Sequence, residues 1–188
     1  DKSNIIDFKT LKNLVLLDLS SNKLNFQILS MCGFYLLTNL STLSIKNVNL
    51  NSNDSIDFLN NLYSLKELDL SENSFHINGI FMQNSTKLVF IILRKCNLDS
   101  IDKDKFDFDL FPDLLYIDLS FNFIKIIKSN YFKLPRYDSI ILAYNNITEF
   151  SFSMLENSFI FLDLSFNNIK GYFKTFNIFR CFHFLLNN

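Results

Sequence analysis

Apolar residues return along the chain in one fixed order, eight times over. The first complete copy reads Leu14-Val-Leu-Leu17-Asp-Leu19-Ser-Ser-Asn22-Lys-Leu24, with leucine at positions one, four, six and eleven. Positions four and six lie two residues apart, so in an extended strand both side chains point to the same face. Each copy is therefore expected to supply one short strand that buries this face, while positions three, five, seven and eight stay on the open side.

Position nine of the copy carries a polar residue where an apolar one would be expected. A buried Asn at this point can donate to and accept from the backbone of neighbouring copies, and stacked copies would form a ladder of such bonds. Cys is a weaker substitute, and the side chain of Val48 cannot form hydrogen bonds. With spacings of 20 to 26 residues, the predicted ladder residues are Asn22, Asn73, Cys96, Asn122, Asn145, Asn167 and Asn187.

The phrase L-x-x-L-x-L-x-x-N/C-x-L, recurring at this spacing, is the signature of leucine-rich repeats. It predicts an α/β fold, a right-handed solenoid or horseshoe with one parallel concave β-sheet of about eight strands. Residues 1–188 are expected to form a single solenoid. Neither end carries a polar or disulfide-bonded cap, which solenoids normally need, so the chain is interpreted as an uncapped fragment of a longer one.

Four copies share the wording LDLSxN: Leu17–Asn22, Leu68–Asn73, Leu162–Asn167 and, with Ile first, Ile117–Asn122. This wording resembles the extracellular repeats of plant leucine-rich-repeat receptor-like proteins and receptor-like kinases. The resemblance implies a glycoprotein at the extracellular face of the plasma membrane, held by a segment outside this chain. It also implies signal transduction in plant defence, with a peptide or protein ligand and a co-receptor as partners.

The chain departs from the plant pattern after position nine, where that pattern continues with L-x-G-x-I-P and builds a second strand. Only the copy at Asn167 keeps the glycine, as Gly171. The first copy instead continues Leu24-Asn-Phe26-Gln-Ile28, and the fifth Ile124-Lys-Ile126-Ile-Lys128. Because Gly permits backbone geometries that Phe and Ile resist, a second strand is not expected in most copies.

Four N-x-S/T sequons provide candidate glycosylation sites, at Asn39, Asn53, Asn84 and Asn146. The chain is rich in Asn, Ser and Thr, and chance alone gives a similar number. The sequons are thus compatible with an extracellular location and do not argue for it.

Composition excludes several classes of function. The formal net charge is −1 with both signs interspersed, so no nucleic-acid partner is predicted. Cys32, Cys96 and Cys181 lie far apart, so neither a metal site nor a cofactor is expected. The longest apolar run, Leu88 to Leu93, is too short to cross a bilayer. Two distant histidines, with no nucleophile elbow or phosphate loop, indicate that the chain is not an enzyme.

Aromatic residues collect on the open face of the C-terminal copies. Position eight changes from Ser21, Asn47 and Glu72 to Lys95 and then to aromatic residues, and position three changes in a similar way. An exposed aromatic patch rimmed by polar groups usually marks an interaction surface. The alternative is that a chain with 23 Phe places rings everywhere. The predicted partner-binding residues are Phe90, Tyr116, Phe121, Tyr144, Phe161 and Phe166, with Arg94 and Lys95 beside them to pair with an acidic group.

These patterns predict a protein- or peptide-recognition module of a cell-surface receptor, with its ligand on the concave sheet. Two other interpretations stay open, an intracellular leucine-rich-repeat scaffold and a non-functional gene fragment.

Overall fold

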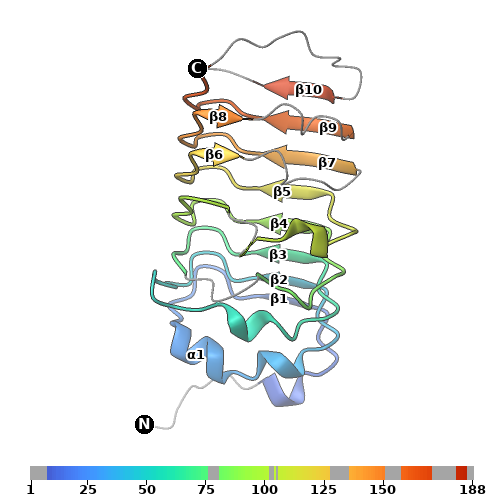
Figure 1. Ribbon diagram of the computed structural model, residues 1–188. Coiled ribbons are helices and arrows are strands. Elements are labelled where there is room, and N and C mark those ends of the chain that lie inside the picture. The colour runs from blue at the N-terminus through green and yellow to red at the C-terminus, as the bar shows by residue number, and fades with distance from the viewer. Residues whose placement is uncertain are drawn as a thin grey trace.

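The computed structural model describes residues 8–75, 81–101, 104, 106–127, 136–150, 158–170 and 181–185. Within this part of the chain, a sheet of eight parallel strands runs through the whole molecule, one strand per coil (Figure 1). The strands follow one another in sequence order, which confirms the predicted repeat solenoid. They are β1 (Leu16–Asp18), β2 (Thr42–Ser44), β3 (Glu67–Asp69), β4 (Phe90–Ile92), β5 (Tyr116–Asp118), β7 (Arg136–Ile141), β9 (Ser158–Asp163) and β10 (Cys181–Leu185).

The register of the sheet keeps equivalent positions of the repeat in line. Residues at position four face one another across every pair of neighbouring strands, as Leu68 faces Ile91. A one-residue slip would move every apolar side chain to the opposite face, so the repeat itself selects this register. The full row at position four is Leu17, Leu43, Leu68, Ile91, Ile117, Ile140, Leu162 and Phe184.

Short helices connect the strands in the N-terminal coils. The α-helix α1 (Phe26–Met31) begins after Asn25, whose side chain accepts a hydrogen bond from the Ile28 backbone N–H and so caps the helix. The other described helices are 3-10 helices, which fit the tight connections of a coil. They are η1 (Phe8–Thr10), η2 (Phe34–Leu36), η3 (Asp57–Leu59) and η4 (Phe108–Leu110).

A second, two-stranded parallel sheet lies across the coil from the long one (Figure 1). It is formed by β6 (Ile126–Ile127) and β8 (Glu149–Phe150). The expectation that the fifth repeat lacks a second strand is therefore wrong. Ile126 and Ile127 are β-branched and favour extended backbone even without the glycine of the plant pattern. The first repeat forms α1 at the corresponding place.

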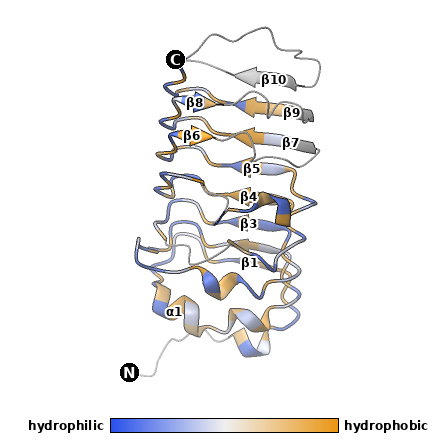
Figure 2. Cartoon of the chain, in the orientation of Figure 1, coloured by the Kyte–Doolittle hydropathy of each residue, from blue (hydrophilic) through white to orange (hydrophobic). Residues whose placement is uncertain are grey.

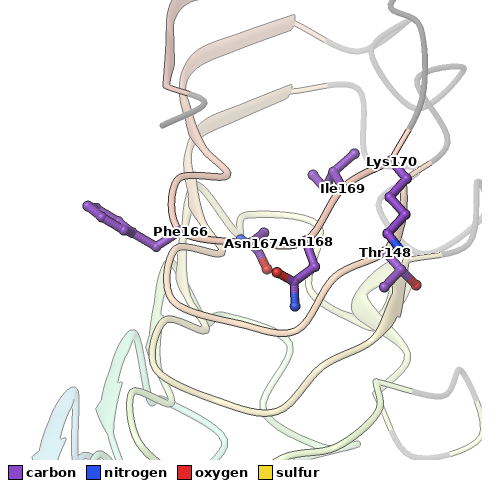
Figure 3. Close-up of a pocket in the computed structure, with 6 residues that line it drawn as sticks. All are labelled: Thr148, Phe166, Asn167, Asn168, Ile169 and Lys170. Atoms are coloured by element: carbon purple, nitrogen blue, oxygen red, sulfur yellow. The ribbon is translucent and has the colours of Figure 1, made fainter. Parts of the chain in front are cut away.

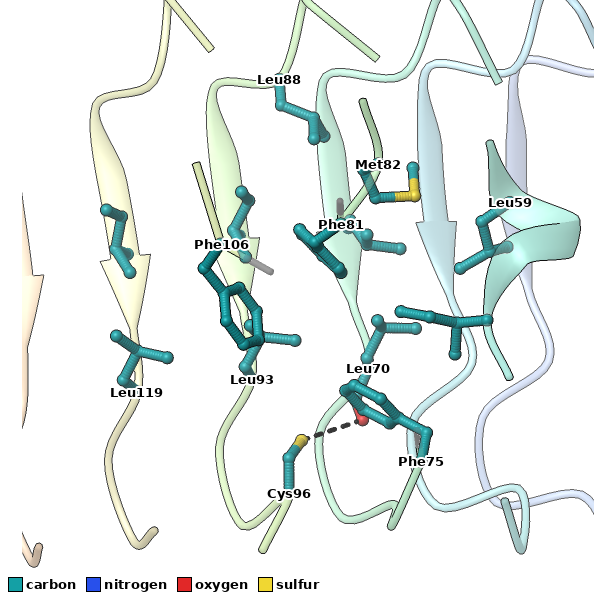
Figure 4. Close-up of a cluster of buried hydrophobic side chains, with 14 of the residues drawn as sticks. Leu59, Leu70, Phe75, Phe81, Met82, Leu88, Leu93, Cys96, Phe106 and Leu119 are labelled. Atoms are coloured by element: carbon teal, nitrogen blue, oxygen red, sulfur yellow. Dashed lines mark hydrogen bonds between the residues drawn. The ribbon is translucent and has the colours of Figure 1, made fainter. Parts of the chain in front are cut away.

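The core is the apolar interior of the coils, and each coil carries both hydrophobic and hydrophilic stretches (Figure 2). Leucines and isoleucines of the strands meet phenylalanines from the connecting segments there (Figure 4). Phe81 and Phe106, both buried, pack with ring centroids 5.3 Å apart and ring planes tilted by 39°. Phe34 and Phe58 pack at 5.3 Å in the N-terminal coils. These aromatic pairs join neighbouring coils. A single coil could not bury its apolar face alone, so the contacts between coils complete the core.

Position nine supplies hydrogen bonds between coils. Asn122 is buried; its Nδ2 donates to the carbonyls of Leu119 at 2.9 Å in its own repeat and Leu93 at 2.8 Å in the preceding one. Its Oδ1 accepts from the N–H groups of Cys96 at 2.9 Å and Leu98 at 3.1 Å. The same kind of bonding to the preceding repeat is made by Asn73, Asn145 and Asn167.

Two predicted ladder residues behave differently, and Asn187 lies outside the described residues. The Cys96 thiol donates to the Leu70 carbonyl over 3.4 Å, so it bridges repeats through a weaker bond (Figure 4). Asn22 is exposed and donates only within its own repeat, to Leu19 and Ser20. Asn22 links no repeats because β1 is the edge strand of the described sheet.

Candidate binding surface

Position eight has a left-handed backbone in every repeat that the structure describes. The φ angles of Lys95, Phe121, Tyr144 and Phe166 lie between 54° and 58°, and the N-terminal repeats share this geometry. This region is uncommon for residues other than Gly and Asn. Each position-eight residue follows a strand by three residues, so the same turn recurs at the same edge of the sheet. Phe166 points away from the coil, on the opposite side from Lys170 (Figure 3).

Because the backbone repeats, the aromatic side chains at position eight stack on one another. The ring centroids of Phe121 and Tyr144 lie 4.2 Å apart with 15° between the ring planes. Tyr144 and Phe166 are also 4.2 Å apart, at 12°. The Arg94 guanidinium carbon lies 4.2 Å from the centroid of Phe121, and Lys95 Nζ is 5.8 Å from it. We call these five residues the aromatic strip.

Phe121 and Tyr144 expose ring edges rather than ring faces. Both faces of Tyr144 are covered by its neighbours, and Phe121 lies between Tyr144 and Arg94. Tyr144 nevertheless stays 43% exposed and Phe166 46% exposed. The exposure of Tyr144 must therefore come largely from its edge and tip. Such large apolar groups at a surface are a feature of binding sites.

A smaller aromatic group lies at position three, at the opposite end of the strands. Phe90 on β4 and Tyr116 on β5 pack with centroids 5.8 Å apart and tilted by 39°. Burial, and to a lesser extent the charge of Asp118, raises the pKa of Tyr116, against the opposing effect of Arg94. Phe161, half-buried on β9, is separated from this pair by Ser139 on β7. The predicted partner-binding residues thus fall into two rows, one at each end of the strands.

The carboxylates at position five have a local structural role. Each Asp of the LDLS wording accepts a hydrogen bond from the backbone N–H two residues later, as Asp118 does from Ser120 at 2.8 Å. Asp18, Asp69 and Asp163 do the same. Position five is expected to stay on the open side, but Asp118 is 7% exposed, so this side chain is not open to solvent. The turn-forming habit of Asp was the sequence signal for this role.

The basic residues in and next to the strip differ in whether they form ion pairs. Lys46 forms an ion pair with Glu72, with 3.4 Å between Nζ and Oε1. Arg94 and Lys95 form no ion pair within the described part of the chain, and their contacts there are with the Phe121 ring. The N-terminal end of the strip therefore offers two cations to a partner.

The described residues form no cluster of metal-binding side chains. No three His, Cys, Asp or Glu side chains in this part of the chain lie close enough to hold a metal ion. A hollow of about 570 Å³ near the C-terminal coils contains Lys170 as its single ionisable side chain (Figure 3). It is lined by Thr148, Phe166, Asn167, Asn168, Ile169 and Lys170. Among the described helices, none has the length and apolar character to span a bilayer.

All four sequon asparagines are exposed, at Asn39, Asn53, Asn84 and Asn146. The Asn39 side chain donates to the Lys12 carbonyl at 3.2 Å, a bond that an attached glycan would have to share or replace. None of the four belongs to the aromatic strip, although Asn146 follows Tyr144 by two residues.

Comparison with known proteins places the fold. No family model matches the chain, and no curated protein matches it. Among solved structures, a Leptospira interrogans leucine-rich-repeat protein is 27% identical with a TM-score of 0.71, over 86% of this chain and 39% of that one. The ectodomain of the Arabidopsis thaliana receptor kinase GASSHO1/SCHENGEN3, in complex with CASPARIAN STRIP INTEGRITY FACTOR 2, is 25% identical with a TM-score of 0.66, over 85% and 19%.

A third similar structure is TLR13 in complex with ssRNA13, 24% identical with a TM-score of 0.66, over 89% of this chain and 24% of that one. The chain thus spans well under half the length of these three proteins. They share the repeat solenoid described above. By its repeat pattern and its fold, this chain is a leucine-rich-repeat protein.

Proposed function

We propose that the chain is a protein- or peptide-recognition module of a cell-surface leucine-rich-repeat receptor. Its ligand lies on the concave side and contacts the aromatic strip, and signalling passes to parts outside this chain. The observation that carries this proposal is the stack of Phe121, Tyr144 and Phe166, which adjoins two cations that form no ion pair among the described residues. Stacked rings lose little side-chain entropy on binding, because they are already ordered.

The solved neighbours support recognition, and they leave two ligand classes to compare. The plant ectodomain is in complex with CASPARIAN STRIP INTEGRITY FACTOR 2, and TLR13 is in complex with ssRNA13. The formal charge of −1 argues against a nucleic-acid ligand here, because phosphate binding needs a basic footprint. The LDLSxN wording favours the extracellular face of the plasma membrane, with a role in plant defence and a co-receptor as a further partner. The exposed sequons are compatible with this location.

The binding proposal can be tested with a display library of random dodecapeptides. The library is selected on the wild-type protein, and each binder is then measured against the double variant Tyr144→Asn/Phe166→Asn. Asn is chosen because Asn47 already stands at position eight with φ 51°, so the turn should be kept. We expect the double variant to lose roughly tenfold or more in affinity, which is about 1.4 kcal/mol.

The control is Phe123→Asn, which removes a ring that is 52% exposed but lies outside the strip. Other repeats carry Asn at the same position ten, as Asn97 and Asn146 do, so the change is native to the repeat. Binders should keep their affinity for this variant. A library that yields only binders indifferent to the double variant would refute the strip as the recognition site.

The cell-surface part of the proposal needs a different experiment. The chain is expressed in eukaryotic cells once behind a secretory leader and once without it. We expect the secreted form to fold and to carry glycans at one or more of the four sequons, detected by mass spectrometry before and after deglycosylation. A chain that folds only in the cytosol would favour the intracellular scaffold, and one that folds in neither would favour the non-functional fragment.

A further inference from the structure

The chemistry of the aromatic strip restricts the kind of ligand it can hold. An aromatic ring has a negative face and a positive edge. The two faces of Tyr144 are covered by Phe121 and Phe166 at 4.2 Å, and one face of Phe121 is covered by the Arg94 guanidinium. A nucleobase or sugar ring that binds by stacking on a face finds no free face on Tyr144. The edges instead attract the face of a partner's aromatic ring, or an acidic or carbonyl oxygen.

The cations at the end of the strip add a second requirement. Arg94 and Lys95 lie on and beside Phe121 and have no ion-pair partner among the described residues. The nearby carboxylates are already engaged, since Glu72 pairs with Lys46 and Asp118 accepts from the Ser120 N–H. A carboxylate of the ligand would therefore meet two unpaired cations at this end, where a charge-assisted hydrogen bond is stronger than a neutral one.

The length of the strip sets the distance between the two features. Successive steps of 4.2 Å join the Arg94 guanidinium to Phe121, Phe121 to Tyr144, and Tyr144 to Phe166. The guanidinium and the last ring are thus at most about 13 Å apart, which an extended peptide covers in about four residues. An acidic and an aromatic residue two to four positions apart can reach both ends.

We infer that the ligand is an extended peptide segment that carries an internal Asp or Glu within about four residues of an aromatic side chain. The carboxylate binds Arg94 and Lys95, and the aromatic face packs on the edges of Tyr144 and Phe166. This inference rests on the proposed function, because it specifies the partner of the same surface. It goes further in requiring both a negative charge and a ring at a set spacing.

The test uses the selected dodecapeptides that lose affinity for Tyr144→Asn/Phe166→Asn. We expect these peptides to be enriched in Asp or Glu two to four residues from Phe, Tyr or Trp. Each is then resynthesised with both termini blocked and with its acidic residue changed to the amide. On the wild-type protein this change should weaken binding roughly tenfold, as expected for loss of a hydrogen bond to a charged group.

A second protein variant shows whether the carboxylate meets the strip cations. On Arg94→Gln/Lys95→Gln the acidic peptide and its amide should bind equally, so the effects of the two changes would not add. An acidic peptide that keeps its full advantage on this variant would overturn the inference. The matched control is Lys46→Gln, which removes a cation already paired with Glu72 and should leave the advantage intact.

The remaining outcomes separate the inference from the proposed function. If strip-dependent peptides are neutral or basic, the inference is wrong and strip-mediated peptide recognition stands. If blocking the C-terminus alone abolishes binding, a terminal carboxylate rather than an internal acid is recognised, which also overturns the inference. If no peptide depends on the strip but a fluorescent oligothymidylate does, both the inference and the peptide-recognition proposal are refuted.

Discussion

Replacing Asn122 by Ala should destabilise the solenoid more than most single substitutions. Four hydrogen bonds between 2.8 and 3.1 Å join the Asn122 side chain to Leu93, Leu119, Cys96 and Leu98, in its own and the preceding repeat. Alanine leaves these buried groups without a partner, at about 1 kcal/mol or more for each. We expect a loss of about 3–5 kcal/mol in the free energy of unfolding, a large part of the stability of an ordinary domain.

The measurement is urea-induced unfolding followed by circular dichroism, with Asn22→Ala as the matched control. Asn22 occupies the same position of the repeat, but it is exposed and donates only within its own repeat, at 2.8 and 3.3 Å. Its removal should cost about 1 kcal/mol or less. Because Asn122 couples two halves of the sheet, its loss should also broaden the transition, as cooperativity in a solenoid depends on contacts between neighbours. Equal losses for the two variants would refute the argument that the inter-repeat bonds stabilise the fold.

Three further outcomes follow from individual side chains. Burial raises the pKa of the Cys96 thiol to about 12. Iodoacetamide at neutral pH should therefore label Cys96 only after denaturant is added. Rapid labelling of the folded protein, detected by mass spectrometry, would contradict the burial of this thiol. Tyr144→Asn should lower the free energy of unfolding by about 1–2 kcal/mol, because it removes two stacked ring contacts. Phe123→Asn should lower it less. The two variants are compared by thermal unfolding, and equal losses would mean that stacking does not contribute to stability. Hydrogen bonds from the Ser20 side chain and backbone lower the pKa of Asp18 below 3.8, so its stabilising contribution is present above that pH and is lost as the pH falls through the lowered pKa. In an NMR titration, Ser20→Ala should return this pKa towards 3.8, and an unchanged value would show that Ser20 is not the cause.

The repeat made the main features of the fold predictable from local spacing. Apolar residues two apart specify a strand with one buried face, and a constant phase specifies which strands lie side by side. The in-register rows, such as the one through Leu68 and Ile91, follow from that phase. The alignment of aromatic residues at position eight also follows, because equivalent positions of stacked coils must be neighbours.

Other features depended on contacts that spacing does not encode. The fifth repeat forms β6 despite lacking the glycine of the plant pattern, because a neighbouring segment, β8, is there to pair with it. Asn22 has the ladder residue type, yet among the described residues it links no repeats, because its repeat contains β1, the edge strand of the described sheet. Asp118 is buried and accepts a hydrogen bond from the Ser120 backbone N–H. The residue type alone did not predict that this carboxylate would be buried.

The sequence by itself determined that this chain coils into stacked repeats, and it determined which side chains share a row. Periodicity carries this information because hydrophobic burial acts on every copy in the same way. Only the tertiary structure decided that Phe121, Tyr144 and Phe166 stack face to face under Arg94 and leave their edges free. That arrangement arises from a left-handed turn shared by successive coils, and it depends on the backbone angles and side-chain rotamers that the folded chain adopts together.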